Sequence, residues 1–426
     1  YFYDFLLSQF IYLFHFSAED VVFRLFPFYI AVLYGLGFWL FSTTLTKNNI
    51  AIRCILFLVY FAQTLSSVML WTKDSRDYLL GSQPMGLIFD PSVVLSIGIF
   101  LAGLYCLVSI SRSWGYVVLA GLLIGLLAQI KVYAGVTAFV VLAVYVLFLL
   151  IRQRMFLLRG VFTVLIAGFL TVITYLPNNL NAGHLVFMPF RFYSHFIEQP
   201  FFDQLHWGVR EHIFSMHHNT KRIVLLYLEA IGIFWILHLG IKVIIVLNAK
   251  TVLRKTFWHN SSYVLLTTAI IVPAIIATFF VQSVSVFNSI QFFWISITLF
   301  AIPAGFALAR LYRHKLIAFI TSVVLFILLF PAFRYYETQY IFRPPALLIS
   351  HQEQRVYQFI PQHVPKNATL AVLPDKKKGH INWYEMPVVS AMTGRFVFYE
   401  GESTPYALDA EYAKRKKLLT QQDGAI

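Results

Sequence analysis

The sequence is poor in charged residues and in cysteine. Only 12% of its 426 residues are charged, whereas 59% are hydrophobic and the mean hydropathy is +0.72. A soluble domain cannot bury that much apolar surface, so the composition favours a membrane protein. The two cysteines, Cys54 and Cys106, lie in apolar segments, which favours packed thiols over a disulfide. No His, Cys and carboxylate spacing in the sequence is typical of structural zinc, and we therefore predict no metal site.

Acidic residues are also scarce, with 19 Asp and Glu against 33 Lys and Arg, which gives a net charge of +14. An excess of this size is found in nucleic-acid-binding proteins. Here, however, the basic residues are scattered beside apolar segments instead of forming one basic face. That distribution predicts contact with lipid headgroups and a defined membrane topology, and it excludes nucleic acid as the expected partner.

Long apolar runs predict an all-α polytopic membrane protein with about ten transmembrane helices. Asp90 followed by Pro91 is typical of a helix start. A single helix over residues 115–151 would be too long for the bilayer, so we expect a break between Lys131 and Gly135. The predicted spans are residues 22–44, 50–71, 91–111, 115–130, 132–151, 156–176, 223–247, 263–281, 291–311 and 315–331.

Basic residues occur in alternate connections between these spans, and the positive-inside rule places such connections in the cytoplasm. Loop 282–290, "QSVSVFNSI", has no Lys or Arg and is expected on the opposite face. The basic connections contain Lys47 and Arg53; Arg112; Arg152, Arg154 and Arg159; Lys250, Arg254 and Lys255; and Arg310, Arg313 and Lys315. The outer face then receives residues 1–20, 72–90, 178–222, 282–290 and the tail from Arg334.

Two domains are predicted. Residues 1–333 form the multi-pass domain, with interfacial outer loops 72–90 and 178–222. Residues 334–426 form a small extracytoplasmic α/β domain, in which "HQEQRVYQFI" and "DAEYAKRKKLL" predict helices and "ATLAVL" and "GRFVFY" predict strands. Because the chain starts without a signal peptide and stops without a closing element, we expect it to be cut at both ends, with this second domain incomplete.

Four stretches resemble bacterial membrane glycosyltransferases of the GT-C superfamily, a group that includes the dolichyl-phosphate-mannose transferases and arabinosyltransferases. They begin with "YDFLLSQFIYLFHFSAEDVVFRLFPFYIAVLYGLGFWLF" and "GLLIGLLAQIKVYAGV". The third is "NSIQFFWISITLFAIPAGFALA", and the last combines "IPQHVPKNATLAVLP" with "MPVVSAMTGRFVFYEGE". The resemblance covers most of the chain, and these stretches are its clearest parts.

The resemblance implies a sugar donor linked to a polyprenyl phosphate, used on the outer face of a bacterial inner membrane. The acceptor is a glycan, lipid or protein. An acidic residue in the family's first outer loop acts as general base or metal ligand, which leaves a divalent cation as an open cofactor. If residues 1–16 are the helix that follows that loop, the acidic residue lies upstream of Tyr1. The main catalytic residue is then unknown.

Lys131 is the main candidate for substrate binding. Counted from Arg112, the fourth span reaches the outer face close to Lys131. A lysine at the bilayer centre costs roughly 2.5–3.5 kcal/mol on insertion scales, whereas one near the interface snorkels at little cost. Two interpretations follow, an interfacial anchor and a ligand for the donor phosphate. In the second, Tyr133 and Gly135 allow close approach of the lipid headgroup.

The loop "WTKDSRDYLLGSQPMGLIFD" supplies further candidates. Asp74 and Asp77 are catalytic candidates, since the resemblance places a second acidic residue in this region. Arg76 is a candidate phosphate partner, and Gln83 resembles a family position near the substrate opening. The alternative for all four is an ordinary solvated loop.

Loop 178–222 and the span after it add three substrate-binding candidates. Arg191 and His195 are candidates to line an acceptor groove. Glu229 lies inside its span, and an intramembrane carboxylate is a functional hypothesis by default. The alternative for Glu229 is a hydrogen-bonded contact between helices.

Three other functions stay open. A polysaccharide polymerase or ligase would favour an arginine-rich outer loop. A transporter or flippase would show internal repeats and helices broken at matching positions, and the sequence shows no such repeat. The last alternative is an inactive scaffold of the same fold.

Overall fold

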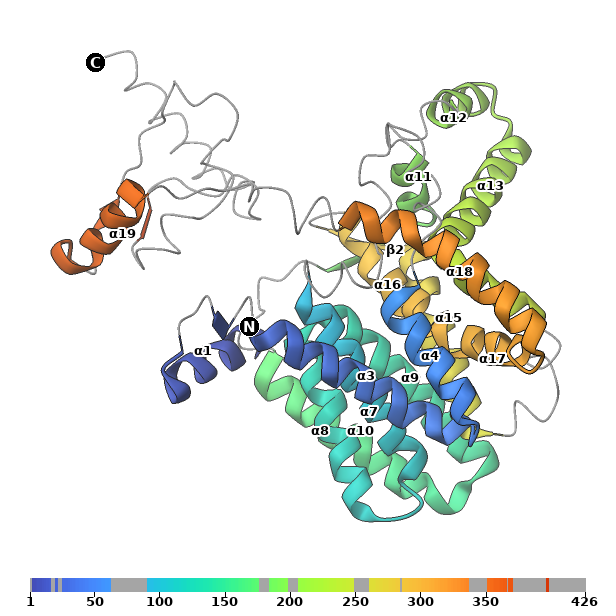
Figure 1. The fold of residues 1–426 in the computed structure, drawn as a ribbon, viewed down its shortest axis with the longest axis horizontal. Coiled ribbons are helices and arrows are strands. Elements are labelled where there is room, and N and C mark those ends of the chain that lie inside the picture. The colour runs from blue at the N-terminus through green and yellow to red at the C-terminus, as the bar shows by residue number, and fades with distance from the viewer. Residues whose placement is uncertain are drawn as a thin grey trace. The chain divides into compact units, whose positions relative to one another are not determined.

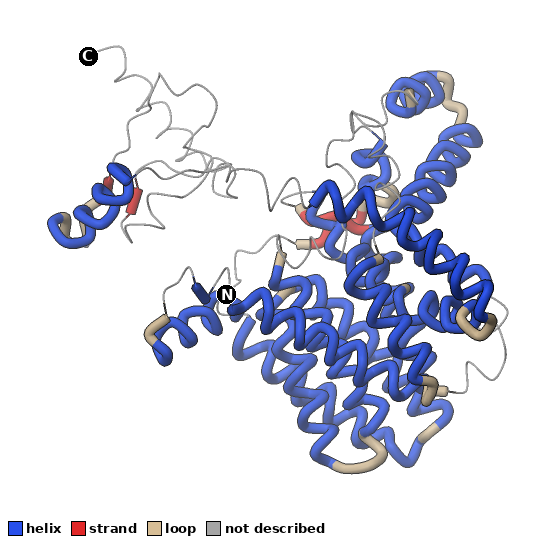
Figure 2. The backbone as a smooth tube through the Cα atoms, in the orientation of Figure 1, coloured by secondary structure: helices blue, strands red, loops and turns tan. Residues whose placement is uncertain are grey.

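The computed structural model describes residues 2–16, 20–21, 25–62, 90–175, 184–197, 206–248, 260–283, 286–336, 351–365, 367–370 and 396–397. Within these residues the chain is mostly helical, with only four short strands (Figure 2). It divides into two compact units, Tyr1–Thr338 and Gln339–Ile426.

The first unit is a bundle of helices (Figure 1). Its α-helices are α1 (Phe2–Phe14), α3 (Phe26–Leu45), α4 (Asn49–Phe61), α7 (Pro91–Ser109), α8 (Trp114–Ile130), α9 (Val132–Arg152), α10 (Leu157–Tyr175), α11 (Arg191–Ile197), α12 (Trp207–Met216), α13 (Thr220–Leu239), α15 (Ser261–Phe279), α16 (Ile290–Leu299), α17 (Ala301–Leu311) and α18 (Lys315–Tyr336). The described part of this unit also contains the 3₁₀ segments η2 (Arg154–Phe156), η5 (Gly240–Asn248) and η7 (Val286–Ser289). Strands β1 (Leu185–Phe187) and β2 (Phe280–Gln282) pair antiparallel.

Seven helical segments among the described residues are long and apolar enough to cross a membrane, so the chain has the architecture of a multi-pass membrane protein. They are Phe26–Leu45, Pro91–Ser109, Val132–Arg152, Arg154–Tyr175, Thr220–Ile244, Ser261–Phe279 and Ile290–Leu311. Shorter apolar helices, Asn49–Phe61, Trp114–Ile130 and Lys315–Phe330, lie where the remaining spans are predicted. The total of ten spans stays a prediction.

Two local predictions are confirmed at the helix ends. Asp90 caps α7, because its side chain accepts a hydrogen bond from the Val93 amide, and Pro91 takes the first helical position. The long apolar run breaks at Lys131, which has extended backbone angles of φ −155° and ψ 115° between α8 and α9. Helix length and capping chemistry were therefore sufficient to place both features.

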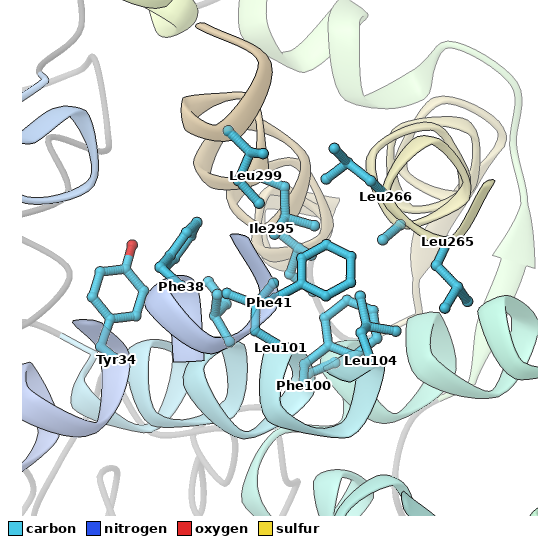
Figure 3. Packing of buried hydrophobic residues seen from close by; sticks show 14 of the residues in the cluster. Tyr34, Phe38, Phe41, Phe100, Leu101, Leu104, Leu265, Leu266, Ile295 and Leu299 are labelled. Carbon is cyan, nitrogen blue, oxygen red and sulfur yellow. The ribbon is translucent and has the colours of Figure 1, made fainter. Parts of the chain in front are cut away.

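The core of the bundle lies where α3, α7, α15 and α16 meet. Figure 3 shows aromatic and leucine side chains from these four helices packed together, among them Phe38, Phe100, Leu266 and Leu299. Helices α3 and α7 approach closely at a pair of glycines. A Cβ atom on Gly37 would lie 2.5 Å from the carbonyl oxygen of Gly98, so no larger residue fits there.

The second unit contains α19 (His351–His363) and strands β3 (Thr369–Leu370) and β4 (Phe396–Val397). The strands pair in parallel, with Thr369 opposite Phe396. The helix predicted for "HQEQRVYQFI" and short strands within "ATLAVL" and "GRFVFY" are thus present. The helix predicted for "DAEYAKRKKLL" lies outside the described residues. The outer-face location of this unit and its α/β character as a domain stay predictions.

Candidate functional site

Lys131 occupies the single non-helical position between α8 and α9. Its amide donates to the carbonyl of Leu127 at 2.8 Å, and its carbonyl accepts from the amide of Gly135 at 3.1 Å. The residue therefore closes the last turn of one helix and opens the first turn of the next. Because these two hydrogen bonds hold its backbone, the Cα atom from which its side chain extends has a fixed position.

The ammonium of Lys131 forms an ion pair with Asp90. The distance from Nζ to Oδ2 is 2.7 Å, and the two side chains are 22% and 20% exposed. The other oxygen, Oδ1, accepts from the Val93 amide at 3.2 Å and from the Ser92 hydroxyl at 2.5 Å. A carboxylate at a helix N-terminus is also favoured by the helix dipole. Both oxygens of the carboxylate are thus bonded, with three donors in all, whereas two of the three N–H groups of Lys131 have no partner among the described residues.

Tyr133, the second residue of α9, links the α8–α9 junction to a pair of amide side chains. Its hydroxyl donates to Oε1 of Gln282 at 2.5 Å. The amide of Asn288 donates to the same oxygen at 2.9 Å. The ring of Tyr133 lies edge-on to Phe292, with centroids 4.9 Å apart and an interplanar angle of 88°. Tyr133 is two residues from Lys131, so the amide pair lies near the same helix junction as the ion pair.

We call this group the Lys131 cluster; its members are Asp90, Lys131, Tyr133, Gln282 and Asn288. They come from the start of α7, the junction of α8 with α9, the end of β2 and the 3₁₀ segment η7. The positive-inside rule predicts all of these positions on the outer face. Tyr133 and Gln282 are 149 residues apart in the chain, so only the tertiary fold brings them together.

Gly135 has a structural role that differs from its predicted one. A Cβ atom there would lie 2.7 Å from the Cα atom of Ala128 in α8. The glycine therefore allows α8 and α9 to pack closely below their junction, and its role in the approach of a lipid headgroup stays a prediction. Tyr133 is only 6% exposed, so its ring is part of the bundle and its hydroxyl is held by Gln282.

Four of the predicted site residues, Asp74, Arg76, Asp77 and Gln83, lie outside the described residues. Arg191 and His195 lie in α11, which packs against α13 and α15, and the Arg191 guanidinium is 3.5 Å from the Ser194 hydroxyl. The side chain of His195 is likewise outside the described set. Among the predicted residues whose side chains the structure describes, it brings Lys131 and Tyr133 into one cluster.

Glu229 is engaged by the neighbouring helix α12. One carboxylate oxygen lies 3.1 Å from the Arg210 guanidinium, and the other accepts from the Trp207 indole at 3.4 Å. This geometry favours the hydrogen-bonded helix contact over substrate binding. In the adjacent α11, burial raises the pKa of Tyr193 to about 12, so this phenol stays neutral at physiological pH.

Two basic side chains are deeply buried where α13 is followed by η5. Lys242 is 1% exposed, and its ammonium donates to the carbonyl of Ile297 at 2.9 Å. His238 is 2% exposed, and its Nδ1 lies 2.8 Å from the carbonyl of Phe234. Ile297 belongs to the last turn of α16, where the helix is interrupted at Phe300. Lys242 therefore acts as a C-terminal cap for α16 inside the bundle.

Sequence reasoning missed three members of the Lys131 cluster. Asp90 was assigned only as a helix cap, although an acidic cap at a membrane surface is also available to a neighbouring cation. Gln282 and Asn288 carry amides in a loop that was noted only for its lack of Lys and Arg. Two amides in a short loop between apolar spans were the available signal.

Chemically, the cluster combines one cation with spare donors and an amide pair that is only partly used. It suits an anionic, hydroxyl-bearing ligand. Within the described ranges no group of three His, Cys, Asp or Glu side chains is placed to hold a metal ion. No protein-family model, curated protein or solved structure matches this chain.

Proposed function

We propose that the chain is a membrane glycosyltransferase that transfers a sugar from a polyprenyl-phosphate donor to a glycan, lipid or protein acceptor on the extracytoplasmic face. The Lys131–Asp90 pair carries the proposal. A lysine that is held at one N–H, and is partly exposed at a helix junction, is able to offer its remaining N–H groups to a phosphate.

In the proposed reaction the acceptor hydroxyl oxygen attacks the anomeric carbon of the donor sugar. The bond from that carbon to the phosphate oxygen breaks, and its electron pair leaves with the phosphate. Lys131 would stabilise this growing negative charge. The hydroxyl proton passes to a carboxylate base. Asp90 already accepts from three donors, so we assign it the positioning of Lys131 instead of proton transfer.

An apolar groove supports a lipid-linked donor. It has a volume of about 440 Å³ and lies between α13 and α15, with Phe300 at the α16–α17 interruption. The lining residues are Trp235, Leu239, Ile270, Ile271, Ala274, Ile275, Thr278, Phe279 and Phe300. Phe279 ends α15 directly before β2, so about three residues of strand, or roughly 10 Å, separate it from Gln282. A prenyl chain in the groove would bring its phosphate toward the Lys131 cluster.

A break between α16 and α17 would favour a transporter as the second candidate, because transporters use broken helices, but Phe300 keeps helical backbone angles of φ −59° and ψ −17° there. Here the α16 end is capped by Lys242, and Pro303 follows in the first turn of α17. A fixed cap and a proline explain the interruption as a structural feature. A measurement that finds sugar transfer but no net transport of the free sugar would favour the transferase over the transporter.

The test is the affinity of the purified full chain for farnesyl methyl phosphate, a prenyl phosphodiester without a sugar. Lys131→Met should weaken binding by about 10- to 100-fold, the loss of one charge-assisted contact. Lys221→Met, which removes an exposed lysine at the start of α13, serves as the matched control and should leave binding unchanged. Unaltered affinity in Lys131→Met, together with altered membrane insertion, would establish the anchor interpretation instead.

A further inference from the structure

The amide groups of the Lys131 cluster have unused hydrogen-bonding capacity. A carboxamide oxygen has two acceptor sites, and Oε1 of Gln282 fills both with Tyr133 and Asn288. The amide nitrogen of Gln282 and the amide oxygen of Asn288 then have no partner among the described residues. Exchanging the nitrogen and oxygen positions in both amides keeps these contacts. The amide oxygen of Gln282 and the amide nitrogen of Asn288 are then the free acceptor and the free donor. The cluster thus presents both kinds of group to a ligand.

These free groups are held rigidly. Gln282 ends β2, where it pairs with Leu185 of β1, and the adjacent Ser283 exchanges hydrogen bonds with His184. Asn288 lies in η7, directly before α16. Tyr133 holds Gln282 from the opposite side, and its own ring is fixed edge-on to Phe292. Preorganised polar groups of this kind discriminate between ligands because little ordering is required when they bind.

The neighbouring charge restricts the class of ligand. Lys131 is two residues from Tyr133 at the α8–α9 junction, where Lys131 pairs with Asp90 and Tyr133 bonds to Gln282. A ligand that contacts the ammonium and the amides together must carry an anion next to groups that both donate and accept hydrogen bonds. Sugar hydroxyls do both. A simple lipid phosphate provides the anion but has no hydroxyl array.

We propose that Gln282 and Asn288 bind hydroxyls of the donor's sugar ring while Lys131 holds its phosphate, with Tyr133 positioning Gln282. This inference rests on the proposed function and adds the residues that select the sugar. A site built to bond a hydroxyl rejects a ligand without one, because its buried polar groups are left unpaired.

The experiment compares two probes of equal charge on the purified full chain. One is farnesyl methyl phosphate, and the other is a series of farnesyl phosphodiesters of glucose, mannose and arabinose. The wild-type chain should bind at least one glycosyl diester more tightly than the methyl diester. Gln282→Met and Asn288→Ala should each remove about tenfold of that preference and leave the methyl diester within twofold. Gln153→Met, the same substitution at the opposite end of α9, is the control for general destabilisation.

Each other outcome has a definite meaning. Equal binding of all probes by the wild-type chain, or equal weakening of both probe types by the amide variants, overturns the sugar-selection role. In those cases dependence of methyl-diester binding on Lys131 would still support the proposed function. Failure of the wild-type chain to bind any probe overturns both proposals.

Discussion

The two ends of the helical bundle hold their cations in different ways. At the end predicted to be cytoplasmic, Arg159 donates to the backbone carbonyls of Ile110 and Ser111 at 2.6 and 2.7 Å, and its guanidinium lies 5.5 Å from the centre of the Trp114 ring. At the other end, Lys131 has a carboxylate partner and is two residues from Tyr133, which bonds to a partly used amide pair. Arg159 thus bonds to carbonyls at the C-terminal end of α7. Lys131 pairs with Asp90, which is the N-cap of the same helix.

This contrast separates structural cations from candidate site residues. A cation bonded to backbone carbonyls satisfies groups that the helix end would otherwise leave unpaired, so its role is structural. Lys242, bonded to the Ile297 carbonyl, belongs to the same class. A cation bonded to one side chain retains donors and neighbours that are available to a ligand. By this criterion Lys131 is the candidate and Lys242 is not, although Lys242 is the more deeply buried.

The largest expected effect concerns which end faces outward, because labelling of a cysteine is nearly all or none. The native Cys54 and Cys106 are buried and should give little background. A membrane-impermeant maleimide should label Ser283→Cys in intact cells and Ser113→Cys only after the membrane is opened, since Arg112 and its neighbours hold that end inside. Ser403→Cys should behave like Ser283→Cys if the second unit is extracytoplasmic. The reverse pattern would invalidate the outer-face function.

A smaller effect is expected from Arg159→Leu. The change removes two charge-assisted hydrogen bonds from a half-buried side chain, so the free energy of unfolding in detergent should fall by about 2–3 kcal/mol. Arg159→Lys should recover part of this loss, because an ammonium is able to reach one carbonyl. Binding of farnesyl methyl phosphate should stay within twofold for both variants. A specific loss of binding at full stability would mean that the structural assignment of Arg159 is wrong.

The sequence predicted features that depend on local chemistry. Apolar run length located the helices, Asp90 with Pro91 located the start of α7, and the limit on helix length located the break at Lys131. Each of these follows from a few neighbouring residues. The direction of the chain through the membrane also follows from local charge, but it stays a prediction.

The rest of the candidate site depends on contacts that no local pattern encodes. Gln282 reaches Tyr133 because β1 and β2 pair at the end of α15, and neither short strand has a distinctive alternation. The ion pair joins residues 41 positions apart. Lys242 did carry a signal, because a lone lysine in an apolar span calls for a partner. Its partner is a backbone carbonyl, which no sequence pattern identifies.

The smallest expected effect tests how Asp90 serves the helix and the lysine separately. Asp90→Asn should keep the cap, because asparagine is as good an N-cap as aspartate, but it removes the charge paired with Lys131. Stability should fall by less than about 1 kcal/mol, as for other partly exposed ion pairs. Asp90→Ala removes the cap as well and should cost about 1 kcal/mol more.

Without the competing carboxylate, the Asn variant should bind farnesyl methyl phosphate about two- to fivefold more tightly, since the lost pair is worth ~0.5–1 kcal/mol. Transfer should nevertheless slow, because Lys131 loses the group that positions it. Equal stability of the Asn and Ala variants would show that the side-chain cap is unimportant, and unchanged phosphate affinity in both would show that Asp90 does not control Lys131.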